Sequence, residues 1–454
     1  MNWARVIGGV VFAGAAGALS AAAGQPDKIV WTIAITALTA SWWMTEALPI
    51  PVTSLVPIAL FPMAGILTQA EAAEAVGSYV VVLLMASFML SKSLEKSGAH
   101  ERLALYMIRL VGLSGRRLVF GFMFASALLS MWISNTATTL MLATMAFAIL
   151  ARADDPRLAA PLLLGIAYAS SLGGTGTLIG TPPNLIFADA YAKATGEEFT
   201  FVRWMMTGVP VAIVGAPLMA LWLTRNLGGV AAPTLADAGP WRKAEIRTLI
   251  VFGAAVVAWI TRSEPFGGWA GLFQIEAAGD STVALLAVIA MFVVPDGKGG
   301  ALLDWKSASD IPWGMLLLFA GGICIAEAFR ASDLDKVIAG SLGGLAEAPV
   351  ILMMIGLCLA VSFLTEITSN TATANLLMPV LAAVATGAGV APELLMIPAV
   401  ISCSCAFMLP VATAPNAIIY ASGQVSMARM AREGFVLNII VALAVAAVCW
   451  ITLL

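Results

Sequence analysis

The chain is a series of long apolar segments, and this feature constrains its fold more than any other. A helix of about 20 apolar residues spans the hydrocarbon core of a bilayer. Hydrophobic residues make up 61% of the chain and charged residues only 11%, against roughly 25% in soluble domains. We therefore expect an all-α, polytopic membrane protein. This composition excludes soluble enzymes, and a net charge of -3 without a basic cluster excludes a nucleic-acid partner.

The apolar runs, taken between charged residues or Gly and Pro, define the expected membrane segments. They are residues 4–23, 29–47, 52–66, 77–95, 118–150, 158–188, 205–224, 247–261, 281–295, 312–329, 349–386, 394–425 and 434–454. The segments 118–150, 158–188, 349–386 and 394–425 are too long for one simple crossing and too short for two with a loop. Each of these four must therefore turn back or break.

The distribution of Lys and Arg indicates a topology. If 118–150 and 349–386 are re-entrant hairpins that enter and leave on the same side, the other eleven segments cross the membrane. With the N-terminus inside, this arrangement places most of the 23 Lys and Arg residues on the inner side, as the positive-inside rule requires. We therefore expect eleven transmembrane helices, a cytoplasmic N-terminus and an external C-terminus.

Two short motifs occur twice, in the same order, within the overlong segments. The sequence Ser-Asn-Thr-Ala-Thr is found unchanged at residues 134–138 and 369–373, at the tips of the expected hairpins. Gly-Thr-Pro-Pro-Asn at 180–184 is then matched by Ala-Thr-Ala-Pro-Asn at 412–416. A single Ser-Asn-Thr in a membrane helix would most often hydrogen-bond a neighbouring helix. Two matched pairs indicate an internal repeat.

The number of crossings between the hairpins predicts that the repeats are inverted. Five segments lie between them, an odd number, so the hairpins open to opposite sides. Inverted repeats with helices that break near mid-membrane are typical of secondary transporters, which bind substrate and ions at the broken ends. We expect breaks from Gly173 to Pro183 and from Pro410 to Pro415, because Pro removes a backbone donor. Unpaired backbone at that depth must face a cavity or a ligand.

The four overlong segments contain only one charged side chain, that of Glu366. An anion would therefore meet amides, hydroxyls and helix N-termini in place of Lys or Arg. Carbonyl and side-chain oxygens suit a small hard cation such as Na⁺. Desolvating a carboxylate-sized ion ideally costs of order 20 kcal/mol, and a helix end contributes only about 1–2 kcal/mol. Bound cations must therefore neutralise a dianion.

At these residues the chain resembles the divalent anion:sodium symporter (DASS) family, the INDY-type di- and tricarboxylate transporters. Besides the two repeated motifs, the segments Trp42-Trp-Met-Thr-Glu-Ala-Leu-Pro-Ile-Pro51 and Leu364-Thr-Glu-Ile-Thr-Ser-Asn-Thr371 resemble family signatures, so the likeness covers nearly the whole chain. It implies a homodimer that works by an elevator mechanism. Each protomer would combine a scaffold domain with a transport domain made of both hairpins and both broken helices.

The resemblance also implies a domain division. Residues 1–117 are expected to be rich in scaffold helices and residues 191–348 to be connecting helices, mainly scaffold. Residues 118–190 and 349–428 would form the two halves of the transport domain. Residues 429–454 would be the C-terminal helix.

Site residues follow from the resemblance by motif position. The first Na⁺ site would use Ser130, Ser134, Asn135 and Gly180, and the second would use Thr365, Thr368, Asn370 and Ala412. The substrate carboxylates would face Asn135, Thr136, Thr181, Asn370, Thr371 and Thr413. The chain departs from the family at Ala414, where the second motif usually has a Pro.

The resemblance favours sodium-coupled import of C4-dicarboxylates such as succinate, malate and fumarate across the bacterial cytoplasmic membrane. The alternatives within the family are a dicarboxylate exchanger and a citrate or sulfate carrier. An exchanger would most simply use Lys, Arg or His in the binding region, and none occurs in the hairpin cores or broken helices. Glu46 and Glu366 remain open between a structural hydrogen-bonding role and a role on the ion path.

An intramembrane serine protease is the alternative from a different class, because Gly112–Gly115 matches G-x-S-G. That chemistry needs a histidine base on a membrane helix. The single histidine, His100, lies in the same basic segment and is interpreted as a solvated loop residue. The sequence therefore favours a transporter over an enzyme.

Overall fold

The computed structural model describes residues 3–113, 115–151, 155–227, 239–263, 267–275, 277–341 and 349–454. These residues form helices and no strand, with one isolated β-bridge between Pro295 and Ala301. Within them, 7 helical stretches are long and apolar enough to cross a membrane. The expected class, an all-α polytopic membrane protein, is confirmed.

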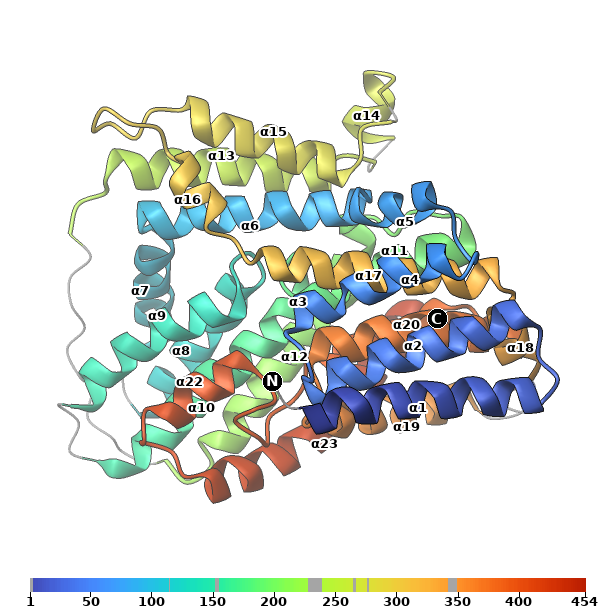
Figure 1. Cartoon of the computed structure of the whole chain (residues 1–454). Helices are drawn as coiled ribbons and strands as arrows, with labels where there is room; N and C mark the ends of the chain where they lie inside the picture. Colours follow the sequence, from blue (N-terminus) through green and yellow to red (C-terminus); the bar gives the residue numbers. More distant parts are fainter. Residues whose placement is uncertain are drawn as a thin grey trace.

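The first quarter of the chain forms one group of helices. They are α1 (Trp3–Ala22), α2 (Asp27–Thr45), α3 (Ile50–Thr53), α4 (Leu55–Met63), α5 (Gln69–Val76), α6 (Tyr79–Ser97) and α7 (Ala99–Val111). A second group is α12 (Phe201–Leu223), α13 (Lys243–Ile260), α14 (Gly268–Leu272), α15 (Asp280–Val293), α16 (Trp305–Ser309), α17 (Trp313–Ala331) and α18 (Leu334–Ser341). In Figure 1, α13 and α15 lie next to α6, on the side of the molecule away from α1.

Each of the four overlong segments consists of two helices. The first pair of segments forms α8 (Gly115–Ser130) with α9 (Asn135–Leu150), then α10 (Ala159–Gly173) with α11 (Pro182–Thr195). The second pair forms α19 (Val350–Leu364) with α20 (Asn370–Ala388), then α21 (Glu393–Cys403) with α22 (Ala414–Ala421). Short 3₁₀ helices η1 (Pro156–Leu158) and η2 (Gly174–Gly176) flank α10, and α23 (Met427–Leu453) ends the chain. We call α8–α11 the first repeat and α19–α22 the second repeat.

The repeated motifs lie where a new helix begins. Ser134 caps α9 by accepting a hydrogen bond from the Ala137 N–H, at 3.2 Å, and Thr413 caps α22 in the same way from the Asn416 N–H. Prolines occupy the first two positions of α11 and the second position of α22, where the missing N–H costs no hydrogen bond. The motifs therefore end one helix and start the next.

The first break lies at its predicted position, whereas the second begins earlier in the chain than predicted. The first break, residues 174–181 between α10 and α11, falls where Gly and Pro predict it. The second break, residues 404–413, was expected to begin at Pro410 and instead begins at Ser404. No Gly or Pro marks that start, because side chains distant in sequence hold this part of the chain, as described below.

The interpretation of His100 as a solvated loop residue is wrong. His100 lies in the first turn of α7, only 7% of it is exposed, and its Nδ1 lies 3.0 Å from the Leu94 carbonyl oxygen. The neighbouring Arg102 is also buried and its Nε lies 3.0 Å from a carboxylate oxygen of Glu245. Helix α7 is amphipathic, and its charged face made it resemble a loop in the sequence.

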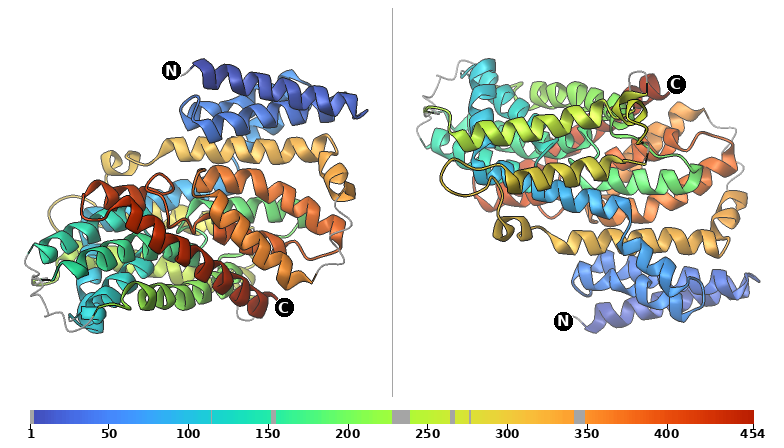
Figure 2. Two further views of the ribbon diagram at one scale, coloured as in Figure 1. Left: turned by 90° about the horizontal axis from the view of Figure 1, so that it is seen from below. Right: turned by 90° about the horizontal axis from the view of Figure 1, so that it is seen from above.

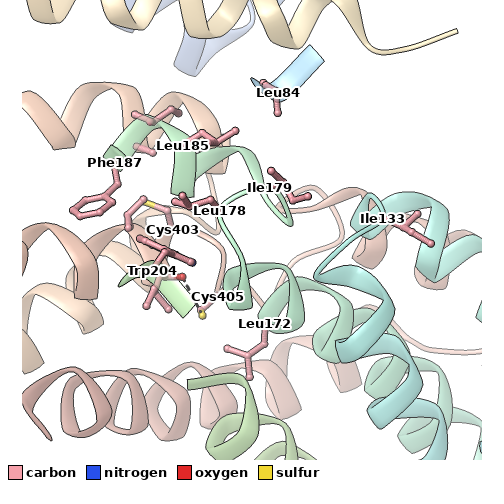
Figure 3. Close-up of a cluster of buried hydrophobic side chains, with 14 of the residues drawn as sticks. Leu84, Ile133, Leu172, Leu178, Ile179, Leu185, Phe187, Trp204, Cys403 and Cys405 are labelled. Atoms are coloured by element: carbon pink, nitrogen blue, oxygen red, sulfur yellow. Dashed lines mark hydrogen bonds between the residues drawn. The ribbon is translucent and has the colours of Figure 1, made fainter. Parts of the chain in front are cut away.

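The breaks of the two repeats pack together in the interior. Leu178, in the first break, and Leu185, in the first turn of α11, belong to the same apolar cluster as Cys403, the last residue of α21, and Cys405, in the second break (Figure 3). The ring centroids of Tyr168 and Phe407 lie 5.0 Å apart. In both views of Figure 2, α1 and α2 form one edge of the molecule, and α17 packs against α2 on the side that faces the rest of the chain. The repeats therefore share one core.

Candidate functional site

A cavity of about 820 Å³ lies where the two repeats meet. The residues expected to face the substrate all line it, namely Asn135, Thr136, Thr181, Asn370, Thr371 and Thr413. Besides Asn135 and Asn370, four more of the residues assigned to the Na⁺ sites line it, namely Ser134, Gly180, Thr368 and Ala412. The structure thus brings together polar groups that are more than two hundred residues apart in sequence.

Ser130 and Thr365 do not line this cavity. Each contacts the asparagine five residues later: Ser130 Oγ donates to Asn135 Oδ1 at 2.5 Å, and Thr365 Oγ1 donates to Asn370 Oδ1 at 2.7 Å. Ser170 Oγ further donates to the Asn135 carbonyl oxygen at 2.9 Å. These hydroxyls therefore fix both amides at the cavity edge in equivalent positions.

Four helix N-termini converge on the cavity. The first residues of α9, α11, α20 and α22 all contribute to its lining. Their unpaired N–H groups and the positive ends of the helix dipoles favour an anion. The lining contains no Lys, Arg or His, and its one charged side chain is that of Glu46. An anion here would be bound by helix ends, amides and hydroxyls.

Asn184 and Asn416 brace the two breaks in the same way. Asn184 Nδ2 donates to the carbonyl oxygens of Gly174 and Thr177, at 3.0 and 2.7 Å. Asn416 Nδ2 donates to those of Ala406 and Leu409, at 3.0 and 3.1 Å. Both asparagines are fully buried. The sequence assigned them no role, although their shared place at the end of each second motif was a usable signal.

Glu366 holds the second break. Its carboxylate accepts hydrogen bonds from the backbone N–H groups of Phe407, Met408 and Leu409, at 2.6, 2.8 and 3.0 Å. Asn438 of α23 donates a further one at 2.8 Å. These contacts show a hydrogen-bonding role for Glu366. They also explain why the second break begins before Pro410, since they replace helical backbone bonds.

Glu46 differs from Glu366 because it lines the cavity and is exposed. It ends α2 in the left-handed conformation, with φ of 48°, which is uncommon for a residue other than Gly. The wall beside it is formed by the bulky side chains of Trp43, Phe88, Trp132 and Met315. Sequence reasoning missed these four, because apolar residues in apolar segments carry no local signal.

Helices α12 and α23 pack against the two breaks, and each helix makes this contact at a glycine of its own, Gly208 or Gly434. A Cβ at Gly208 would lie 2.4 Å from the Thr175 carbonyl oxygen, and one at Gly434 would lie 2.1 Å from that of Phe407. Only glycine permits this approach of backbone to backbone. Both breaks are therefore supported by the same kind of contact, a helix glycine packed against backbone.

A helical membrane protein with two repeats, broken helices and a shared neutral cavity at their junction has the architecture of a secondary transporter. Residues 40–396 match the citrate transporter family (CitMHS). The chain belongs to this family of membrane transporters, which confirms the resemblance to the divalent anion:sodium symporters.

Curated relatives resemble the chain over most of its length. It is 36% identical to the sodium-dependent dicarboxylate transporter SdcS of Staphylococcus saprophyticus, over 91% of this chain and 84% of that protein. It is 37% identical to SdcS of Staphylococcus aureus strain MSSA476, over 92% of this chain and 85% of that protein. The protein is therefore a transporter and not an enzyme. Ser114, the nucleophile of the protease alternative, lies outside the described residues.

Solved structures resemble the chain in fold. The YdaH transporter of Alcanivorax borkumensis aligns with a TM-score of 0.59 at 14% identity, over 92% of this chain and 98% of that one. MtrF of Neisseria gonorrhoeae, from a class of antimetabolite efflux pumps, aligns with a TM-score of 0.50 at 16% identity, over 91% and 96%. At these identities the likeness concerns the fold alone.

Proposed function

We propose that this protein is a sodium-coupled carrier that imports C4-dicarboxylates across the bacterial cytoplasmic membrane. The observation that carries the proposal is the cavity lined by both Ser-Asn-Thr motifs and four helix N-termini, without a basic side chain. The names of the staphylococcal relatives, sodium-dependent dicarboxylate transporters, support it. Succinate, malate and fumarate are the proposed substrates.

The substrate's two carboxylates would be divided between the repeats. One would bind beside Asn135, Thr136 and Thr181, and the other beside Asn370, Thr371 and Thr413. Each group of residues provides an amide, two hydroxyls and two helix N-termini at the cavity. Hydrogen bonds to a charged carboxylate are roughly twice as strong as those between neutral groups.

One Na⁺ would bind at each hairpin tip. The first site would use Ser130, Ser134, Asn135 and Gly180, and the second would use Thr365, Thr368, Asn370 and Ala412. The hydroxyls of Ser130 and Thr365 already contact the asparagine amide oxygens, so the potential ligands are clustered before an ion binds. Two cations would neutralise a dianion, which removes the cost of burying it without Lys or Arg.

The proposed mechanism is an elevator movement in a homodimer with a cytoplasmic N-terminus and an external C-terminus. Eleven crossings and two re-entrant hairpins would form inverted repeats. The transport domain, residues 118–190 and 349–428, would move against scaffold residues 1–117 and 191–348, while residues 429–454 form the C-terminal helix. Contacts such as Asn375 Nδ2 to the Leu318 carbonyl oxygen, at 3.2 Å, and Arg203 Nη2 to a carboxylate oxygen of Glu393, at 3.2 Å, join the proposed domains through polar groups that can exchange partners.

The proposal is tested with purified protein in liposomes under an imposed inward sodium gradient. Uptake of labelled succinate, citrate and sulfate is measured in parallel, with protein-free liposomes as the control. Succinate uptake that malate and fumarate inhibit, with little citrate or sulfate uptake, is the expected result. Preferred uptake of citrate or sulfate would overturn the substrate class while retaining the carrier.

A further inference from the structure

The two hairpin tips differ by one buried charge. Glu366 lies between Thr365 and Thr368, two of the proposed ligands of the second Na⁺ site, and only 3% of it is exposed. In the first repeat the equivalent position is Met131, which is also buried. The tips therefore provide similar neutral oxygen ligands in different electrostatic surroundings.

The partners of Glu366 fit an ionised carboxylate. The three backbone N–H groups and the Asn438 amide that contact it are all donors. A carboxylate accepts hydrogen bonds at both oxygens, whereas a carboxylic acid must also donate one. Among the described residues, no Lys or Arg forms an ion pair with Glu366, so its negative charge is available to a nearby cation.

The first break is held without a charge. Thr177 Oγ1 donates to the carbonyl oxygen of Met131. The Met131 side chain packs so closely on Gly176 that a Cβ there would lie 2.7 Å from its terminal methyl carbon. Gly176 corresponds in the repeat to Met408, whose N–H bonds to Glu366. An apolar contact in one repeat thus replaces a charged hydrogen bond in the other.

We propose that Glu366 makes the second Na⁺ site the tighter of the two, so that this site fills at lower sodium concentration than the first. This inference rests on the proposed sodium coupling. The attraction between a cation at Thr365 and Thr368 and the adjacent carboxylate is much stronger in the protein interior than in water. Met131 provides no such attraction at the first site. Glu366 would not contact the ion. It holds residues 407–409 in place, and its negative charge would attract the bound Na⁺.

The test is sodium binding to the purified protein without substrate, followed through the sodium-dependent rise in thermal unfolding temperature. Glu366→Gln removes the charge, and we expect the half-saturating sodium concentration to rise about tenfold or more. Asn438→Ala removes one donor but leaves the charge, and we expect a change of less than about twofold. Glu366→Asp also keeps the charge and is expected to bind sodium nearly as the wild type does. The KM for succinate at saturating sodium should stay close to the wild-type value in all three variants.

Each outcome is decisive for the inference. Equal losses of sodium affinity in Glu366→Gln and Asn438→Ala would show that Glu366 only holds the loop, and unchanged affinity in Glu366→Gln would remove its electrostatic role. If Glu366→Gln does not fold, a large loss in Glu366→Asp or Asn438→Ala overturns the inference, because both keep the charge. Wild-type protein that neither binds sodium nor takes up succinate would overturn the proposed function itself.

Discussion

The first and second repeats share a backbone frame but hold it with different chemistry. In both, an asparagine amide donates to carbonyl oxygens of the break, and a hydroxyl donates to the asparagine of the Ser-Asn-Thr motif. In both, a glycine of the following helix, α12 or α23, lets that helix pack closely against the break. The anchors differ. The first break is held by the Trp204 indole, which donates to the Thr175 carbonyl oxygen at 2.8 Å, and the second by Glu366 and Asn438.

This difference shows that the path of the backbone and the groups that hold it are under different constraints. The path of the backbone must match in both repeats because each must present two helix N-termini to one cavity. The side chains that hold the backbone on the side away from the cavity need not match between the repeats. One repeat uses an uncharged contact where the other uses a carboxylate. A symmetrical cavity therefore has asymmetrical electrostatics.

The largest expected effect is from removing either hairpin asparagine. We expect Asn135→Ala and Asn370→Ala each to lower succinate uptake at least about 100-fold, or about 2.7 kcal/mol, because one amide serves both a carboxylate and a cation. Uptake into liposomes is measured after size-exclusion chromatography has shown that each variant elutes as the wild type does. Near-wild-type uptake by both variants, with unchanged substrate affinity, would remove these residues from the site.

A methyl group at either helix-to-break contact should destabilise the fold. Gly434→Ala and Gly208→Ala would each force a Cβ within 2.4 Å or less of a carbonyl oxygen, so the helix must shift. We expect each to lower the free energy of unfolding by about 1–3 kcal/mol, measured by thermal unfolding in detergent. Gly356→Ala is the matched control, because a Cβ there meets nothing within 4 Å. Loss of stability in only one of the first two variants would show that the repeats are not supported alike.

The clamps Asn184 and Asn416 should be equivalent. Replacing either by Ala removes two hydrogen bonds to break carbonyls, and we expect a loss of about 1–2 kcal/mol in stability with reduced uptake. The comparison uses thermal unfolding and initial uptake rates of both variants under the same conditions. If Asn416→Ala has much the smaller effect, then Glu366 alone holds the second break and the shared clamp is not essential.

Ala414→Pro should have the smallest effect. Ala414 is the first residue of α22, where Pro is favourable, and it corresponds to Pro182 of α11. Thr413 precedes it with φ of -142° and ψ of 151°, close to the -145° and 141° of Thr181, which already precedes a Pro. We expect stability within about 0.5 kcal/mol of the wild type. Loss of substrate binding by the folded variant would show that the breaks differ in geometry.

Much of this fold was predictable from local sequence. Long apolar segments predicted a helical membrane protein, and the two copies of Ser-Asn-Thr-Ala-Thr located the starts of α9 and α20, because helix capping depends on residues that are neighbours in the chain. The start of the second break was not predictable. It depends on Glu366 and Asn438, which reach residues 407–409 only after the chain has folded. The burial of His100 was missed for the same reason.

Part of the candidate site was likewise predictable from local sequence, and part was not. The cavity residues of the repeated motifs were found by their recurrence, and the structure brings them to one place. The apolar wall of Trp43, Phe88 and Met315 was not found, since it belongs to helices outside the repeats. Ser130 and Thr365 were placed in the Na⁺ sites by resemblance, and only the structure shows that each contacts its asparagine from outside the cavity lining.

The central claim is that sodium bound in the two repeats carries the charge of the dianion. The most direct measurement is labelled succinate uptake into liposomes with either sodium or choline outside, with and without succinate inside, under an imposed inside-negative potential. We predict uptake that vanishes in choline and needs no internal anion. If more than two Na⁺ accompany each dianion, uptake also rises with the potential, because at least one net positive charge then moves inward, worth about 2.3 kcal/mol per 100 mV. Robust uptake in choline that requires succinate on the opposite side would contradict the claim and identify an exchanger.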